Sequence, residues 1–268
     1  MRIAGINPIN SFSMYTTPAY TNAIQKLATM KRINTAADDA AGLAISQKLI
    51  GQYRGLDRVA SNVREFRDLI STADGGMDSI TDNLQRMREL TIQASNTIYT
   101  KEDKAAIQQE IDQLKGAIND TVNTVRFNDM NLLDGTFKNK FVTVNANGAG
   151  TRVSIDNMSA IGLSVQNLSV MGDNPSKMLG TIDSAMQTVN SERAELGAQV
   201  NRFDHTFNNV NNASENMKAS DSRIAGLDWA GVSNSINRVN LDYILNSYRY
   251  FMLGQQNQMG LNSISYLL

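Results

Sequence analysis

The sequence predicts a mainly α-helical protein, with a long antiparallel helical rod or coiled coil, a small central β-hairpin, and terminal helices that form a second coiled-coil domain. Three observations predict this fold. Apolar residues recur with alternating spacings of four and three over residues 45–98 and 182–224, which is typical of a narrow helical seam. Between roughly Thr136 and Asn157 the period changes to two, as in strands. Both chain ends carry amphipathic stripes that are too thin to form a core alone.

The composition excludes several function classes. Lys and Arg number 25 and Asp and Glu number 26, so the net charge of −1 shows no basic excess for nucleic acid. No window approaches the ~20 apolar residues of a membrane span, and we expect no membrane insertion. A single His and the lack of Cys exclude a His/Cys zinc site and a disulfide framework. Because phosphate-binding loops and nucleophile motifs are also missing, the sequence predicts no enzyme and no cofactor.

The first long helix is predicted from Ile45 to Ile98, a length of roughly 80 Å. Its seam is apolar except at Gln52 and Thr91. The pair Gly75-Gly76 interrupts the pattern, and each glycine costs about 1 kcal/mol relative to alanine. We therefore expect a bend or a close helix contact at this pair.

A second helix and the hairpin follow. The helix seam begins at Ile107, continues through Leu114 to Val125, and precedes a turn-rich segment at residues 127–135. The hairpin is predicted from FVTV (141–144) and RVSID (152–156), because NANGAG between them supplies two glycines for a turn.

The C-terminal half returns to helix. Ser176 is the expected N-cap of a helix whose seam runs from 182 to 224 with polar breaks at Arg193, Ser214 and Asp221. A last helix is expected at about Trp229–Gly260. Nothing nearby in the sequence covers its apolar stripe, which consists of Leu241, Ile244, Leu245, Tyr248, Phe251, Met252 and Met259.

The N-terminal forty residues are less regular. Pro8 and Pro18 limit helix there to short pieces, and Ile24, Leu27 and Ile33 form only a weak stripe. The following stretch RINTAADDAAGLAIS, residues 32–46, is small and flat. Within it, Asp38 and Asp39 place negative charge near a helix N-terminus, with Arg32 as an ion-pair partner.

Six segments together resemble bacterial flagellin, and they occur in the family's order. They are RINTAADDAAGLAIS (32–46), LQRMRELTIQASN (84–96), IQQEIDQL (107–114), FNDMNLLDG (127–135), LGAQVNRFDHTFNNVNNASENMKASDSRI (196–224) and SYRYFMLGQQNQ (247–258). The resemblance implies a structural subunit that self-polymerises into the flagellar filament for motility. Only about forty residues separate the matching motifs, which implies a short form with almost no variable outer domains.

The resemblance also implies a domain organisation. Residues 1–43 would form the N-terminal part of the inner terminal domain with its connector, and residues 229–268 its C-terminal part. The stretch 32–46 would be a packed connector between the inner tube and the outer rod, where small residues let neighbouring subunits approach and Gly42 removes a Cβ where backbones crowd. Residues 44–135 and 176–228 would form the rod helices. Residues 136–175 would hold the β-hairpin and the remnant of the variable region.

Partners and location follow from the same resemblance. No cleaved signal peptide is visible, and general export signals would indicate a cytoplasmic protein. The family instead is exported through the hollow flagellum, which implies a secreted, extracellular protein of the bacterial filament. The implied partners are further copies of the chain in a helical polymer, a flagellar export chaperone, the hook-associated and cap proteins, and Toll-like receptor 5 of animal hosts. The apolar stripe of the last helix would bind this chaperone or pack in the inner tube of the filament, and both uses need the same residues.

The family's receptor-recognition surface carries over onto the first two rod helices. It corresponds to Arg86 and Leu90 with Gln85 and Gln93 beside them, and to Glu110. Arg86, Leu90 and Glu110 lie off the predicted seam, so we expect them to face outward. Subunit contact within the filament is the expected primary role of these residues, and a receptor could read the same residues on monomers.

Three alternatives remain on the sequence. A hook–filament junction protein shares the terminal helices, although the intact DDAAGLAIS and the QRMREL and IQQEI motifs favour flagellin. Departures in the terminal segments, such as ATMK at 28–31 and AGLDWA at 225–230, leave a minor flagellin open. A helical signalling module is the remote alternative, because it would lack the hairpin and normally follows a membrane span.

Overall fold

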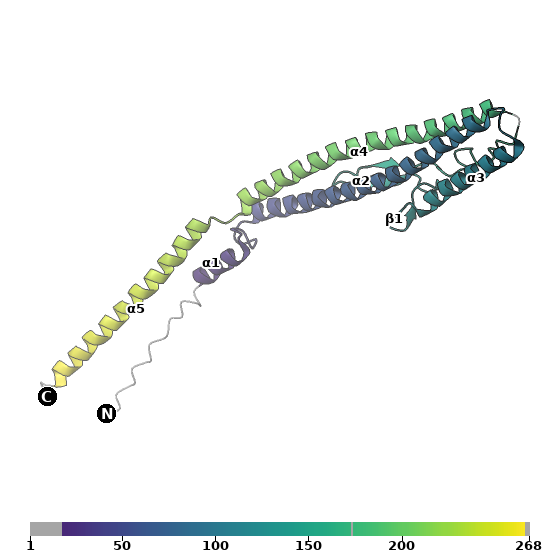
Figure 1. The fold of residues 1–268 in the computed structure, drawn as a ribbon. Coiled ribbons are helices and arrows are strands. Elements are labelled where there is room, and N and C mark those ends of the chain that lie inside the picture. The colour runs from purple at the N-terminus through teal and green to yellow at the C-terminus, as the bar shows by residue number, and fades with distance from the viewer. Residues whose placement is uncertain (1–17, 173, 266–268) are drawn as a thin grey trace. The chain divides into compact units, whose positions relative to one another are not determined.

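A computed structural model describes residues 18–172 and 174–265, and side chains within these ranges except at residues 18, 19, 250 and 257–265. Helices α1 (Pro18–Thr29), α2 (Ala40–Ala94), α3 (Lys101–Thr124), α4 (Pro175–Ala225) and α5 (Trp229–Ser265) make up most of it (Figure 1). The strands pair as two antiparallel sheets, β1 (Arg126–Phe127) with β2 (Met130–Asn131) and β3 (Lys140–Thr143) with β4 (Gly150–Val153). The mainly α-helical fold with a small β-hairpin is confirmed.

The chain divides into two compact units. One contains the described residues up to Gly51 together with those from Asn216 onward, and the other is Gln52–Glu215. Both divisions fall inside helices, α2 and α4. None of the described helices is long and apolar enough to cross a membrane.

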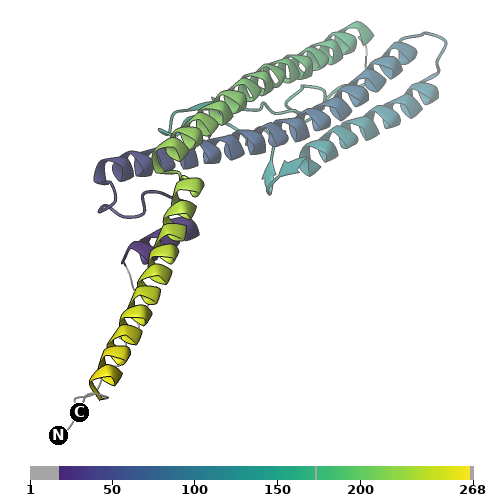
Figure 2. The ribbon, with the colours of Figure 1, turned by 90° about the vertical axis from the view of Figure 1, so that its left-hand side faces the viewer.

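The core of the unit Gln52–Glu215 lies where α2 packs between α4 and α3 (Figures 1 and 2). The α2 positions Val63, Ile70, Met77, Ile80, Leu84 and Met87 are buried, as are Ile111 and Ile118 of α3 and Ile182, Val189 and Leu196 of α4. Their four–three spacing places them on the contacting faces. The seam of α4 is confirmed as well, since every predicted position from Ile182 to Ile224 is buried or half-buried.

The predicted seam of the first long helix holds from Leu56 to Ala94 and fails at both ends. Ile45 and Gln52 are exposed, whereas Ser46 and Ile50 are buried, so the buried face at the start of α2 does not follow the predicted positions. Ile98 lies beyond the helix, which ends at Ala94, and its side chain is 76% exposed. The prediction of a seam extending to Ile98 is therefore wrong, because the polar turn before α3 begins earlier.

The glycine pair does not break α2, which continues through it. A Cβ on Gly76 would lie 2.7 Å from Val125 Cγ2 and 2.8 Å from Leu133 Cδ1, whereas a Cβ on Gly75 would meet nothing within 4 Å. Of the two expected outcomes, a close contact is the one observed. It is made by Gly76 with the segment that follows α3.

The β-hairpin forms where period two predicted it, with Lys140 opposite Val153 and Thr143 opposite Gly150. Val142 and Val153 are buried, so one face of the ribbon packs on the unit. The β1–β2 pair was not predicted, because its strands are only two residues long. Its turn uses positive φ at Asn128 and Asp129, of 46° and 63°, conformations that Asn and Asp tolerate.

An irregular segment after β4 is fastened to α3 by polar contacts. Gln108 Oε1 accepts from Val170 N at 2.7 Å, and Asn119 Oδ1 accepts from Ala160 N at 3.0 Å. The Lys115 ammonium is buried, donates to Leu168 O at 2.6 Å and pairs with Asp112 at 2.9 Å. The predicted seam included Leu114 and not Lys115, because it was chosen by apolar character. Apolar character does not show that a lysine is buried where its ammonium has partners.

In the other unit, α1 begins with Pro18 at its first position, where a missing N–H is tolerated, and it packs against α5. Lys31 bridges to Gly226 just after α1. Ile33 is buried, while Ile24 is exposed and Leu27 half-buried, as a weak stripe would be. Pro8 lies outside the described residues.

The caps of the two C-terminal helices are aspartate or asparagine. Asp228 Oδ1 accepts from Gly231 N at 3.2 Å before α5. Before α4, Asn174 Oδ1 accepts from Lys177 N at 3.2 Å and Pro175 takes the first helical position. The prediction of Ser176 as the N-cap is therefore wrong by two residues.

Candidate functional site

The apolar stripe of α5 is open to solvent. Each of the following side chains is between 53% and 65% exposed: Leu241, Ile244, Leu245, Tyr248, Phe251 and Met252. Earlier in the same helix, Val232, Ile236 and Val239 are half-buried. The side chain of Met259 lies outside the described residues. A contiguous apolar patch of this kind marks an interaction surface.

The connector at residues 32–46 is packed within the chain. Asp39 immediately precedes α2, and its Oδ1 accepts from Gly42 N at 2.8 Å, as an N-cap side chain does. Gly42 is buried, and a Cβ there would lie 2.7 Å from Ile33 Cδ1 and closer still to the Asp39 carboxylate. Glycine is needed here for close packing inside one subunit.

Asp38 closes a local turn before the helix. Its Oδ2 accepts from the backbone N–H groups of Thr35 at 3.0 Å and Asn34 at 3.1 Å, and from the Thr35 hydroxyl. Its Oδ1 pairs with Lys26 at 3.3 Å. The two backbone donors, Thr35 first, stabilise the carboxylate and lower the pKa of Asp38 to about 2.

Arg32 fastens the connector to the end of α4. Its backbone N donates to Ala225 O at 2.8 Å, and its Nη2 donates to Ile224 O at 2.7 Å. The predicted ion pair between Arg32 and the aspartates is wrong, because the guanidinium donates to the Ile224 carbonyl, one of those that a helix end leaves free. A buried Ser46 hydroxyl also donates to Asp221 Oδ1 at 2.5 Å.

Polar pairs join α2 to α4 along the unit Gln52–Glu215. From one pair to the next, the residue number in α2 rises by nearly as much as the residue number in α4 falls, as antiparallel helices require. The pairs are Asp57 with Ser214, Arg67 with Asp204, Asp74 and Asp78 with Arg193, and Arg88 with Asp183. Predicted polar breaks in the α4 seam are thus occupied by groups with partners.

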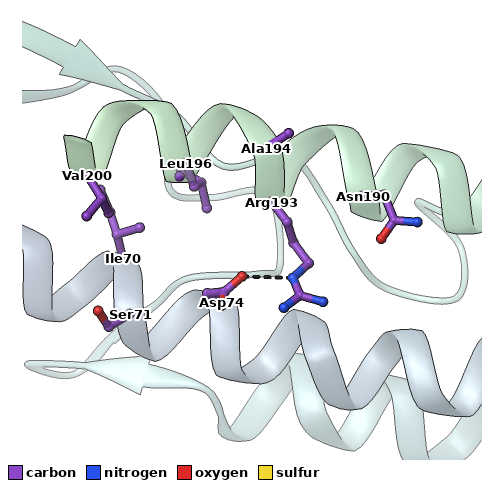
Figure 3. Close-up of a pocket in the computed structure, with 9 residues that line it drawn as sticks. Ile70, Ser71, Asp74, Asn190, Arg193, Ala194, Leu196 and Val200 are labelled. Atoms are coloured by element: carbon purple, nitrogen blue, oxygen red, sulfur yellow. Dashed lines mark hydrogen bonds and ion pairs between the residues drawn. The ribbon is translucent and has the colours of Figure 1, made fainter. Parts of the chain in front are cut away.

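Arg193 spans a groove between α2 and α4 of about 590 Å³ (Figure 3). Its Nε donates to Asp74 Oδ1 and its Nη1 to Asp78 Oδ1, both at 2.8 Å. The hydrogen bond to Asp74 is the main reason that the pKa of Arg193 is raised. Ile70, Leu196 and Val200 form the apolar part of the lining. The ion pairs of Arg193 hold the two helices together.

The structure places the residues predicted for receptor recognition on α2 and α3. Arg86 donates to Glu110 Oε1 through Nε at 2.8 Å and pairs with it through Nη2 at 2.7 Å, which raises the pKa of Arg86. Both side chains remain partly exposed. Gln85 and Gln93 are exposed too, and Gln93 Nε2 donates to the Tyr99 hydroxyl at 3.2 Å.

The prediction that Leu90 faces outward is wrong, because its side chain is only 1% exposed. Helix α2 contacts both α3 and α4, so it buries a second stripe beside the predicted seam. Leu69, Gly76 and Leu90, each one position before a seam residue, belong to this second stripe. One apolar seam read from the sequence could not show that the helix lies between two neighbours.

The sequence did not predict that Lys26 pairs with Asp38, or that the buried Lys115 pairs with Asp112 and donates to Leu168 O. A charged residue four positions after a seam isoleucine, as Lys115 is after Ile111, was the available signal. Among the described residues no group of His, Cys, Asp or Glu side chains could hold a metal ion.

Paired helices, an uncovered apolar helix face and ion-paired seams define a helical structural subunit. The sequence profile of the bacterial flagellin N-terminal helical region matches residues 15–138, and that of the C-terminal helical region matches residues 179–267. The flagellin of Halalkalibacterium halodurans is 39% identical, over 88% of this chain and 87% of its own length. The flagellin of Bacillus subtilis is 36% identical, over 99% and 98%. The chain belongs to the bacterial flagellin family.

Solved structures agree with this membership. The crystal structure of Bacillus cereus flagellin, 28% identical, covers 60% of this chain and 94% of its own length with a TM-score of 0.52. A flagellar hook-associated protein of Vibrio parahaemolyticus has a TM-score of 0.56 at 16% identity, which shows a shared fold alone. Only residues 139–178 separate the two family regions, so this is a short-form flagellin. It is a structural subunit of the extracellular flagellar filament and not an enzyme.

Proposed function

We propose that the subunit polymerises by burying the α5 stripe against the terminal helices of neighbouring copies. The observation that carries the proposal is the solvent exposure of the large apolar side chains from Leu241 to Met252. Burying one such side chain contributes about 1.5–3 kcal/mol. A contact of this kind repeats head to tail without closing, which produces a filament.

The test is seeded polymerisation of the full-length protein, followed by electron microscopy and by measurement of the critical concentration. Leu245→Asp places a charge in the stripe, and we expect the critical concentration to rise about thirtyfold, which corresponds to about 2 kcal/mol. Asn246→Asp is the matched control, because it adds the same charge at the next exposed position outside the stripe. Equal elongation by Leu245→Asp and the wild-type protein would refute the proposal, provided that circular dichroism shows equal helix content.

The domain organisation belongs to the same proposal. Residues 1–43 and 229–268 would form the inner terminal domain, residues 44–135 and 176–228 the rod, and residues 136–175 the remnant of the variable region. The compact unit Gln52–Glu215, with its own buried core, supports assigning the rod there. Limited proteolysis should leave a stable fragment with ends near the rod boundaries. Cleavage inside the paired parts of α2 and α4 that is as fast as cleavage near the rod boundaries would count against the assignment.

We infer that the α5 stripe binds the export chaperone before assembly, because an exposed apolar helix needs shielding in the cell. Export through the flagellum, with hook-associated and cap proteins at the filament ends, follows the same inference. Leu245→Asp should weaken chaperone binding, and Asn246→Asp should not. Chaperone binding that Leu245→Asp leaves unchanged would place the site elsewhere.

We infer that Arg86, Glu110, Gln85 and Gln93 form a subunit contact that Toll-like receptor 5 also reads on monomers. Their exposure and the Arg86–Glu110 pair support this inference. Arg86→Ala should reduce receptor activation by purified monomer and also reduce polymerisation. Arg88→Ala removes a comparable ion pair to Asp183 and is the control. Activation of the receptor by Arg86→Ala at the wild-type level would contradict the receptor role.

A further inference from the structure

The β3–β4 turn contains the one Asn-Gly dipeptide of the sequence, Asn147-Gly148. An asparagine can lose ammonia when the backbone nitrogen of the next residue attacks its side-chain carbonyl carbon. Glycine in the following position favours this attack, because it has no Cβ to hinder the five-membered ring. The geometry of the turn points to a chemical role for this pair.

We propose that Asn147 is a site of spontaneous deamidation, and that the folded hairpin turn directs the reaction to it. Both residues of the pair are exposed, so water reaches them. Gly148 has φ +86°, and a Cβ there would meet nothing within 4 Å, so the space that the ring needs is open. The Asn147 side chain is folded back over the Gly148 peptide, because its Oδ1 accepts from Ala149 N at 3.0 Å.

That hydrogen bond also assists the chemistry. When Gly148 N attacks Cγ of Asn147, negative charge develops on Oδ1, and the Ala149 N–H already points at that oxygen. A donor fixed in advance at a developing oxyanion stabilises the transition state. The Gly148 N–H itself donates to Asn145 O at 3.0 Å, and this exposed turn bond must open first. Local opening of such a turn costs little free energy.

The reaction balances without any partner except water. The Gly148 nitrogen loses its proton to solvent and forms a bond to Cγ, the Cγ–Nδ2 bond breaks, and ammonia leaves to give a succinimide. Water then opens either carbonyl of the ring. The products are aspartate and isoaspartate, and each adds one negative charge.

The two Asp-Gly dipeptides, which could also form a succinimide, are held in conformations that prevent the reaction. Asp74 and Gly75 lie inside α2, where the helix fixes the backbone nitrogen away from the side chain. Asp134 precedes Gly135, which also has positive φ, but its carboxylate accepts from Thr136 N, the Thr136 hydroxyl and Asn131 Nδ2. These hydrogen bonds keep it ionised, and an ionised carboxylate resists attack.

The modification would change the hairpin. Isoaspartate lengthens the backbone by one carbon in a turn where Val144 N and Asn145 N both donate to Ala149 O. The turn also lies against α2, since a Cβ on Gly55 would be 3.1 Å from Ala146 Cβ. Because the succinimide forms without an enzyme and ammonia is lost, the modified fraction records how long a subunit has existed.

The test is timed incubation of the full-length protein in mildly alkaline buffer. One sample is kept folded without urea, and the other is unfolded in urea. Isoaspartate is measured by methylation with protein L-isoaspartate methyltransferase and located by fragmentation of the tryptic peptide Phe141–Arg152. We expect methyl label to accumulate at Asn147 at least as fast in the folded as in the unfolded chain. Asn145, exposed in the same peptide but followed by alanine, is the internal control and should stay unlabelled. Asn147→Gln should lose the label.

Two outcomes would overturn the proposal. One is labelling at Asn145 or Asp134 that equals labelling at Asn147. The other is labelling of Asn147 that is much slower in the folded protein than in urea, because the turn would then protect the pair. We expect Asn147→Gln to form filaments as the wild-type protein does. The labelling experiment therefore tests deamidation separately from the assembly proposal.

Discussion

Leu90 gives the sharpest test of how α2 is packed. Its side chain is 1% exposed, whereas Ile92, two positions further along the helix, is 48% exposed. Truncating a buried leucine to alanine removes apolar transfer free energy and leaves a cavity, which together cost about 2–5 kcal/mol. Ile92→Ala removes the same number of carbon atoms from a surface position, so its cost should stay within about 0.5 kcal/mol.

The difference is large enough to measure by thermal unfolding. In a domain the size of Gln52–Glu215, about 1 kcal/mol shifts Tm by about 2–4 °C. A cost of about 3 kcal/mol for Leu90→Ala should therefore lower Tm by about 10 °C, and Ile92→Ala should lower it by no more than about 2 °C. Far-UV circular dichroism of the monomers provides the assay, and urea unfolding with an unchanged m value is the check on two-state behaviour.

Equal shifts of Tm for the two variants would refute the burial argument. If the expected difference is found, any loss of polymerisation or receptor activation by Leu90→Ala has a structural origin. Leu90 would then be excluded as a direct contact, while Arg86 stays a candidate.

Three further predictions concern the helices and the connector. In urea unfolding, Gly75→Ala should stabilise the fold by about 1 kcal/mol, whereas Gly76→Ala should destabilise it, because only a Cβ at Gly76 meets neighbours. Stability changes of the same sign for both variants would contradict the packing. The lowered pKa of Asp38 means that its stabilising contribution is complete above 3.8 and is lost as pH falls toward about 2, so Asp38→Asn should remove that pH dependence of unfolding. Arg193→Met should cost about 1 kcal/mol at low salt and less at high salt, and a cost that salt does not change would argue against its ion pairs.

Much of the fold was predictable because helical periodicity is a local property. The four–three spacing from Leu56 to Ala94 and from Ile182 to Ile224 identified the faces that pack, and the period-two segments identified the hairpin. Helix ends were less predictable. Asn174 capped α4 in place of Ser176, since several polar residues near a helix start can serve as the cap.

The sequence by itself determined that this protein is a helical rod with uncovered amphipathic ends and no catalytic constellation, and its motifs determined the family. Only the tertiary structure decided which residues lie between two helices and which polar groups have partners. Leu90 became buried because α2 has two neighbours, and Arg32 turned to the carbonyls of Ile224 and Ala225 because α4 ends beside it. Periodicity along one helix records a single direction of burial, and contacts between residues far apart in the chain depend on how the helices come together.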